Sequence, residues 1–204
     1  MMHNLAGDAA LGANVVLPSD HRFDADCYFS KGNLKKAVPL FEACLEGRRS
    51  MLGDEHPDTC DTLEAIGDCW VEKGQYGKAL AVYENCLDIN RRVRGPEHFR
   101  TLSSLNILAC CHLEKGKPKT ALPMFESCLE IKRRVLGSSH IRTLTTVFDT
   151  AECLKELKQF DQALPLYEEC LEGRRALLGT EHSDTKECVK CISSTEKRLK
   201  RSGK

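Results

Sequence analysis

The chain has few aromatic residues and no excess of charge of either sign. Aromatic side chains make up 6% of its 204 residues, so a core has to be built mainly from aliphatic, alanine and cysteine side chains. Its 30 basic residues are balanced by 30 acidic ones. Proteins that bind nucleic acid chiefly through phosphates usually carry a clear positive excess, so a nucleic-acid partner is not expected.

Long apolar runs and targeting signals are also missing. No run approaches the roughly 18–20 residues that span a bilayer. Residues 1–20 have neither a basic start nor a continuous apolar segment of the secretory type, and we expect them to form a flexible N-terminal extension. The composition, 41% hydrophobic and 29% charged, is typical of a folded soluble protein. The sequence thus predicts a cytoplasmic protein with no membrane partner.

Motifs that carry chemistry are absent. The chain contains no GxSxG, HExxH or GxxxxGK[ST] pattern, and no segment predicts a strand that could precede a phosphate-binding loop. We therefore expect no catalytic residue, no cofactor and no enzyme activity.

What the sequence does contain is a repeat of 42 residues. Several residue types recur in this period without any insertion, and a fixed period of 20–50 residues indicates stacked supersecondary units. The recurring sets are Gly53, Gly95, Gly137 and Gly179; His56, His98, His140 and His182; Thr59, Thr101, Thr143 and Thr185; Ala37, Ala79, Ala121 and Ala163; Cys44, Cys86, Cys128 and Cys170; and Cys27, Cys69, Cys111 and Cys153.

Each repeat predicts two helices. Apolar residues follow a helical spacing in segments 101–115 and 76–93. A glycine such as Gly74 or Gly116 marks the turn between the two helices, because it accepts the left-handed conformation that ends a helix. The second helix ends at the glycine of the Gly53 set, and Pro57 suits the first turn of the next one.

These residues resemble the tetratricopeptide repeat. The second unit carries the matching residues Leu63, Ile66, Gly67, Trp70, Gly74, Tyr76, Ala79, Tyr83 and Cys86. The usual repeat has 34 residues, and the 42-residue form with its LG–EH–T joint is similar to the repeats of kinesin light chains. The resemblance implies an all-α, right-handed superhelical solenoid of antiparallel helix pairs, with about four repeats and a C-terminal capping helix.

The repeat sets the expected boundaries. The array covers 21–199, with units near 21–57, 58–99, 100–141 and 142–183, a cap at 184–199 and a basic tail at 200–204. The first helix is atypical, because His21 and Asp24 stand where large apolar residues are expected. Pro39, Pro123 and Pro165 lie early in second helices and should bend or tighten their opening turns rather than break them.

The cysteines and histidines do not predict a metal site. Most of the 12 cysteines follow the repeat, and without a secretory signal we expect them to be reduced and buried as small apolar side chains. Cys188 and Cys191 form a CxxC pair near His182, but no fourth ligand for zinc is evident. The four histidines are one repeat apart, too far for one metal ion, and each is expected to bond the turn that starts the next unit.

By the resemblance, the first helices of the units line a concave groove that binds another polypeptide. The predicted lining residues are Asp61, Glu64, Asp68, Glu72, Ser103, Asn106, Cys110, Glu114, Thr145, Phe148, Glu152, Lys155, Glu187 and Lys190. The N-terminal half of this set is acidic, whereas the grooves of kinesin light chains are basic. The acidic half predicts a partner segment of basic character, with an apolar anchor near Phe148.

The resulting hypothesis is a non-catalytic scaffold that binds a peptide segment of another protein. Kinesin heavy chain enters as a partner by resemblance alone, because no heptad segment of the kind that joins light to heavy chains precedes the repeats. Two alternatives remain open. The first is a regulatory or sensor array that belongs to a larger, NTPase-linked signalling protein, and the second is a redox or zinc protein that uses its cysteines.

Overall fold

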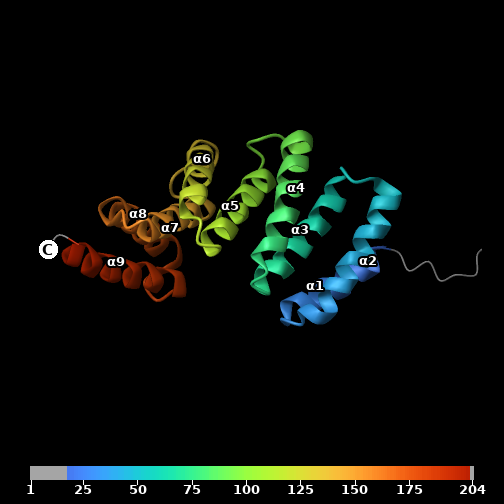
Figure 1. Cartoon of the computed structure of the whole chain (residues 1–204), viewed down its shortest axis with the longest axis horizontal. Helices are drawn as coiled ribbons and strands as arrows, with labels where there is room; N and C mark the ends of the chain where they lie inside the picture. The colour runs from blue at the N-terminus through green and yellow to red at the C-terminus, as the bar shows by residue number, and fades with distance from the viewer. Residues whose placement is uncertain (1–17, 203–204) are drawn as a thin grey trace, which may run out of the picture. The chain divides into compact units, whose positions relative to one another are not determined.

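The computed structural model describes residues 18–202, and over this range the chain consists of helices joined by short connections, with no strand (Figure 1). The predicted extension lies largely outside the described residues, as do residues 203–204. The helices are α1 (Pro18–Ser30), α2 (Leu34–Leu52), α3 (Pro57–Glu72), α4 (Tyr76–Arg94), α5 (Phe99–Glu114), α6 (Pro118–Leu136), α7 (Ile141–Glu156), α8 (Phe160–Leu178) and α9 (Ser183–Ser202).

The helix boundaries confirm the predicted repeat. Helices α2, α4, α6 and α8 begin at residues 34, 76, 118 and 160, and α3, α5, α7 and α9 at 57, 99, 141 and 183, so equivalent helices start 42 residues apart. Helices α3, α5 and α7 each have 16 residues, and α1 is described from Pro18, the first described residue, to Ser30. Helix α9 continues to Ser202 and so includes the start of the predicted tail.

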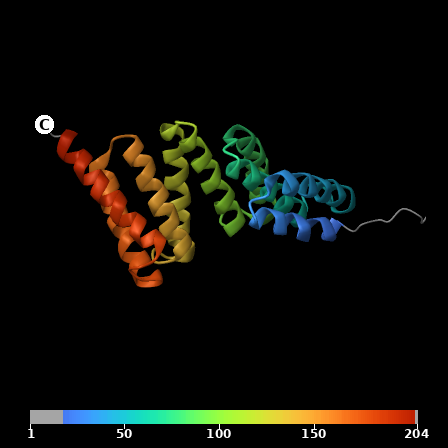
Figure 2. The same ribbon diagram turned by 90° about the horizontal axis from the view of Figure 1, so that it is seen from below.

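The chain divides into two compact units, residues 1–62 and residues 63–204, with the boundary inside α3. In the first unit, α1 packs against α2. In the second unit, each helix from α4 to α9 packs against the next one along the chain, and Figure 2 shows the last of these helices, coloured orange to red, side by side. Each compact unit is therefore built from helices that are neighbours in sequence.

Small side chains fill the positions at which paired helices approach one another. Ala37, Ala79, Ala121 and Ala163 are all fully buried, and so are Cys44, Cys86, Cys128 and Cys170. One aromatic side chain per repeat fills the space beside them, namely Phe41, Tyr83, Phe125 and Tyr167, each at most 1% exposed. The prediction that the cysteines of the Cys44 set act as small buried apolar residues is confirmed.

The repeated histidines form the start of each first helix. In each case the Nδ1 atom accepts a hydrogen bond from the backbone N–H two residues further on, at 3.1–3.2 Å. This satisfies one of the N–H groups that the first helical turn leaves without a partner. The local structural role predicted for His56, His98, His140 and His182 is thus confirmed.

The first helices end in a left-handed turn that usually contains glycine. Gly32, Gly74 and Gly116 have φ angles of 68°, 66° and 69°. The equivalent residue in the last full repeat is Lys158, with φ 62°. Around Gly116 and Lys158 the same pair of backbone hydrogen bonds closes the turn, so the lysine occupies a conformation that suits glycine.

The prolines of the second helices are accommodated as expected. Helices α2, α6 and α8 are continuous through Pro39, Pro123 and Pro165, which lie on their exposed sides. A proline lacks the N–H that would bond the preceding turn, and on a solvent-facing side the carbonyl left without this partner is open to water.

Replacing Lys158 with Gly should stabilise the protein by about 1 kcal/mol, because glycine adopts a positive φ without the steric cost that a side chain adds. The free energy of unfolding, measured by chemical denaturation and circular dichroism, tests this. The matched control is Gly116→Lys, which should destabilise by a similar amount. Equal stability of Lys158→Gly and the parent chain would contradict the expectation.

Candidate interaction groove

The side chains predicted to line the groove differ widely in exposure. Those on the surface are Glu72, Ser103, Glu114, Thr145, Glu187 and Lys190. Those that are half-buried are Asp61, Asp68, Cys110, Glu152 and Lys155. Three others, Glu64, Asn106 and Phe148, are less than 10% exposed. The predicted set therefore mixes an exposed surface with side chains that hold the helices together.

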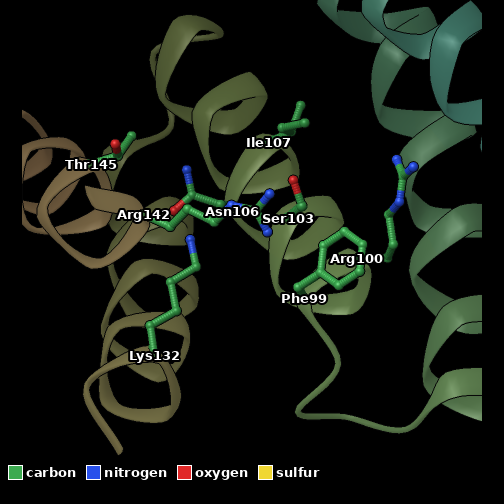
Figure 3. Close-up of a pocket in the computed structure, with 8 residues that line it drawn as sticks. All are labelled: Phe99, Arg100, Ser103, Asn106, Ile107, Lys132, Arg142 and Thr145. Atoms are coloured by element: carbon green, nitrogen blue, oxygen red, sulfur yellow. The ribbon is translucent and has the colours of Figure 1, made fainter. Parts of the chain in front are cut away.

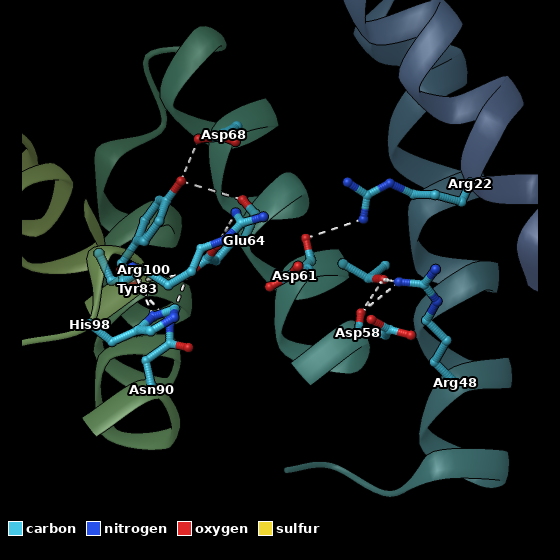
Figure 4. A network of polar contacts seen from close by, with 12 residues as sticks. Arg22, Arg48, Asp58, Asp61, Glu64, Asp68, Tyr83, Asn90, His98 and Arg100 are labelled. Carbon is cyan, nitrogen blue, oxygen red and sulfur yellow. Dashed lines mark hydrogen bonds and ion pairs between the residues drawn. The ribbon is translucent and has the colours of Figure 1, made fainter. Parts of the chain in front are cut away.

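Glu64 belongs to a buried polar cluster and is not an open acidic group. One carboxylate oxygen accepts hydrogen bonds from Asn90 Nδ2 at 2.8 Å and from Ser104 Oγ at 2.9 Å (Figure 4). The other pairs with Arg100 Nη1 at 2.9 Å. Because its charge is compensated internally, the expectation that Glu64 faces a partner is corrected.

Asp68 and Glu152 occupy equivalent positions two repeats apart and have equivalent internal roles. The hydroxyl of Tyr83 donates to Asp68, and that of Tyr167 donates to Glu152, which also pairs with Lys155. Burial disfavours the charged form of Glu152, but the hydrogen bonds from Lys155 and Tyr167 outweigh it and lower the pKa of this carboxyl. Both carboxylates are thus tied to the aromatic residue of their own repeat.

Between these two repeats the pattern changes. Phe125 replaces the tyrosine and has no hydroxyl, and Cys110 takes the place of the carboxylate. Burial, with a smaller effect of the nearby Asp149, raises the pKa of the Cys110 thiol. This makes Cys110 a neutral, poorly nucleophilic group.

Asn106 links α5 to α7 through a chain of hydrogen bonds. Lys132 Nζ donates to Thr146 Oγ1 at 2.7 Å, and the hydroxyl of Thr146 donates to Asn106 Oδ1 at 2.8 Å. Asn106 Nδ2 in turn donates to Asp149 Oδ2 at 2.7 Å. Burial raises the pKa of Asp149, although the bond from Asn106 and the charge of Lys132 oppose this effect.

Phe148 is part of the core and is not an exposed anchor. It is 9% exposed, and its ring contacts Tyr167 edge-on with the centroids 5.5 Å apart. The guanidinium of Arg174 lies over the Phe148 ring, 4.6 Å from the ring centroid. The predicted apolar anchor near Phe148 is therefore corrected, because α8 covers the ring.

The first unit contains its own version of these links. Arg48 Nη1 donates to the carbonyl oxygen of Asp58 at 2.6 Å and to Thr62 Oγ1 at 2.8 Å. Arg22 Nη1 donates to the carbonyl oxygen of Asp61 at 3.2 Å, as Figure 4 shows. Arg48 thus joins α2 to α3, and Arg22 joins α1 to α3.

A pocket lies where α5, α6 and α7 meet in the second unit (Figure 3). Its volume is about 440 Å³. The residues that line it are Phe99, Arg100, Ser103, Asn106, Ile107, Lys132, Arg142 and Thr145. Three of these side chains are cationic and none is a carboxylate, so the pocket has a positive character.

The two arginines of the pocket differ in their partners. Arg100 pairs with Glu64, whereas the exposed guanidinium of Arg142 makes no ion pair within residues 18–202. Both lie close to Phe99, with the guanidinium carbons 5.4 and 5.0 Å from the ring centroid. Arg142 is thus a cation held beside an aromatic ring and available to an anionic group.

Three of the eight residues that line this pocket, Ser103, Asn106 and Thr145, were predicted from the sequence. The other five pocket residues were not predicted. The signal for three of them, Phe99, Arg100 and Arg142, lies directly after the repeated histidines. Pro57–Asp58 and Ser183–Asp184 follow the histidine in two repeats, while Phe99–Arg100 and Ile141–Arg142 follow it in the others. The acidic first turn thus becomes apolar and basic in the two central joints.

The described residues offer no metal centre. Within residues 18–202 no group of three or more histidine, cysteine or acidic side chains lies close enough to hold a metal ion. All 12 cysteines lie in this range and none forms a disulfide. No helix described there combines the length and apolar character required to cross a membrane.

Replacing Glu64 with Leu should lower the free energy of unfolding by about 2 kcal/mol, because Asn90, Ser104 and Arg100 would lose a shared acceptor in a buried setting. Chemical denaturation measures this. The control is Glu84→Leu on the exposed side of α4, expected to change stability by less than about 0.5 kcal/mol. Similar values for the two variants would show that Glu64 acts as an ordinary surface carboxylate.

The chain is similar in structure to several solved proteins. A kinesin light chain protein of Podosopora anserina with nearly identical TPR-like repeats matches with a TM-score of 0.75 and 21% identity, covering 90% of this chain and 87% of the other. BtubC (BKLC) from P. vanneervenii matches with a TM-score of 0.77 and 20% identity, covering 89% and 72%. A Rap protein complexed with competence and sporulation factor matches with a TM-score of 0.73 and 12% identity, covering 94% and 51%.

At these identities the structural likeness establishes the fold, an all-α repeat solenoid. A search of curated protein sequences found no significant match. The family model of the tetratricopeptide repeat matches three overlapping segments, residues 25–84, 71–134 and 120–176, which together cover most of the chain. The chain therefore belongs to the tetratricopeptide repeat family, in a form whose helix repeats resemble those of kinesin light chains.

Proposed function

We propose that this protein is a non-catalytic interaction module that binds an acidic peptide segment of another protein in the pocket between α5 and α7. The observation that carries the proposal is the group of cations around Phe99. It includes Arg142, for which the described part of the chain supplies no ion-pair partner, and the pocket lining contains no carboxylate. Tetratricopeptide repeats generally serve as scaffolds for protein partners, and one structural neighbour, a Rap protein, was solved in complex with competence and sporulation factor.

The chemistry of the pocket fits a carboxylate next to an apolar side chain. Arg142 offers a planar set of N–H donors that matches the two oxygens of a carboxylate. Ser103 and Thr145 are exposed on either side and add hydroxyl groups. Phe99, which is 45% exposed, and Ile107 supply an apolar surface. A volume of about 440 Å³ lies within the range of binding pockets for small groups.

The acidic half of the predicted groove is a weaker candidate. Glu64 already accepts hydrogen bonds from three side chains of the same chain, and Asp68 accepts one from the hydroxyl of Tyr83. A basic partner segment would have to compete with these contacts, whereas an acidic segment meets Arg142 without displacing an ion pair. The proposal therefore differs in charge from the partner expected from sequence.

The second candidate function is that of a regulatory repeat region within a larger protein. The chain spans about half the length of the solved Rap protein, with 94% of this chain covered and 51% of the other. A repeat array of this kind inside a longer signalling protein would use the same groove as a regulatory site. The likeness to kinesin light chains concerns the fold alone, and we do not extend the proposal to a kinesin heavy chain.

Replacing Arg142 with Glu should weaken binding of acidic peptides at least tenfold, because a charge-assisted hydrogen bond contributes about 1.5–3 kcal/mol and would become a repulsion. Binding is measured by fluorescence anisotropy, with a peptide library that places Asp or Glu beside a large apolar residue. Affinity should also fall as salt rises.

The matched control is Arg91→Glu on the exposed side of α4, away from the lining residues, which should leave the affinity unchanged. A library with Lys in place of the acidic residues completes the design. Preference for the Lys library, or equal binding by Arg142→Glu and the parent chain, would reject the proposal.

A further inference from the structure

The contact between α8 and α9 contains a thiol where the equivalent contacts earlier in the chain contain a hydroxyl. In each repeat a long or polar side chain of the second helix reaches a small residue 14 positions later, on the next first helix. The pairs are Arg48–Thr62, Asn90–Ser104, Lys132–Thr146 and Arg174–Cys188. Only in the last pair is the acceptor a thiol instead of a hydroxyl.

This substitution places two thiols against each other. The cysteine of the second helix faces the same small residue, so Cys44 lies opposite Thr62 with 4.0 Å between sulfur and oxygen. In the last repeat the equivalent residues are Cys170 and Cys188, whose sulfur atoms are 3.6 Å apart. Both side chains are fully buried. A shift of the sulfur atoms by less than two ångströms would bring them to disulfide bonding distance.

A buried cation lies beside the pair. Arg174 Nη1 donates to Cys188 Sγ at 3.5 Å and to the carbonyl oxygen of Asp184 at 3.1 Å. Arg174 is itself only 5% exposed and is held over the Phe148 ring. The geometry therefore keeps one positive charge next to the sulfur atom of Cys188.

The electrostatics favour a thiolate at this position. The hydrogen bond with Cys170, together with the charge and hydrogen bond of Arg174, outweighs burial and lowers the pKa of the Cys188 thiol. The neighbouring Cys191 behaves in the opposite way, since burial and then Glu152 raise its pKa to about 12. Cys188 is thus the more reactive member of the CxxC pair.

We propose that Cys170 and Cys188 form an oxidation site, at which a hydroperoxide converts the two thiols into a disulfide that joins α8 to α9. The Cys188 thiolate attacks the peroxide O–O bond and becomes a sulfenic acid, and the peroxide leaves as an alcohol or water. The Cys170 thiol then attacks this sulfur, forming the S–S bond and releasing water. The two sulfur atoms supply two electrons, and the peroxide accepts them.

The location of the pair on α9 allows this chemistry despite its burial. Of the described α9 side chains only Thr185, Cys188 and Thr195 are buried, and most of the others are exposed polar groups. A helix with so few buried contacts opens locally at a lower free-energy cost than the inner helices. Oxidation would remove this freedom and fix the surface of α9, including Glu187 and Lys190.

The experiment treats the purified full-length chain with hydrogen peroxide, blocks remaining thiols by alkylation and maps tryptic peptides without reduction. Cys170 lies in peptide 159–174 and Cys188 in peptide 187–190, while Cys191 falls in the following peptide. The expected product is peptide 159–174 linked to peptide 187–190. The oxidised protein should also unfold a few degrees higher than the reduced one, because the linkage restricts the unfolded chain.

Two variants make the test specific. Cys188→Thr restores the residue found at positions 62 and 146, should fold normally, and should form no linked peptide and show no thermal shift. Cys128→Ser changes the equivalent cysteine, whose thiol lies within hydrogen-bonding reach of Thr146, and should leave the linkage intact. The proposal is overturned if peroxide leaves both thiols open to alkylation, links Cys188 to Cys191, or yields only sulfinic acid at Cys188.

Discussion

The fold depends on the close approach of paired helices, which only small side chains permit. Alanine and cysteine occupy these contact positions in every repeat and are fully buried there. Because the space between the helices is fixed by these residues, one aromatic ring per repeat fits beside them, and the chain needs few aromatics in all. The 42-residue period is the sequence-level expression of this single packing requirement.

A second set of contacts, between side chains of neighbouring helices, differs from one repeat to the next. The side chain that reaches across to the next helix is Arg48, Asn90, Lys132 or Arg174, and its acceptor changes with it. The framework is unaffected, but the local charge and reactivity differ from one joint to the next. The buried polar cluster around Glu64, the basic pocket and the thiol pair thus arise at equivalent joints of one architecture.

Sequence reasoning predicted the features that repeat and missed those that do not. The 42-residue period located the helices and the histidine caps, because many residue types recur at the same positions of each repeat. It could not place Lys158, whose left-handed conformation follows from its position and not from its residue type. It assigned Glu64 and Phe148 to an open surface, since helical position alone does not reveal that Arg100 and Arg174 cover them.

The basic pocket and the thiol pair were missed for a related reason. Lys132 belongs to a second helix, yet its side chain reaches Thr146 on the first helix α7 and lines the pocket. Cys170 and Cys188 are 18 residues apart and belong to different helices. Their proximity depends on how α9 sits against α8, and a pattern that describes single helices contains no such information.

Hydrogen bonds that join side chains of different helices connect residues about one repeat apart, as those of Asn106 with Asp149 and of Glu64 with Ser104 do, 43 and 40 positions apart. Contacts of such short range let a chain gain structure in small steps, without closing long loops first. The array should therefore fold rapidly and from more than one starting point. Loss of the contacts at one joint between repeats should leave the adjacent repeats folded. Damage to such a molecule would be local rather than global.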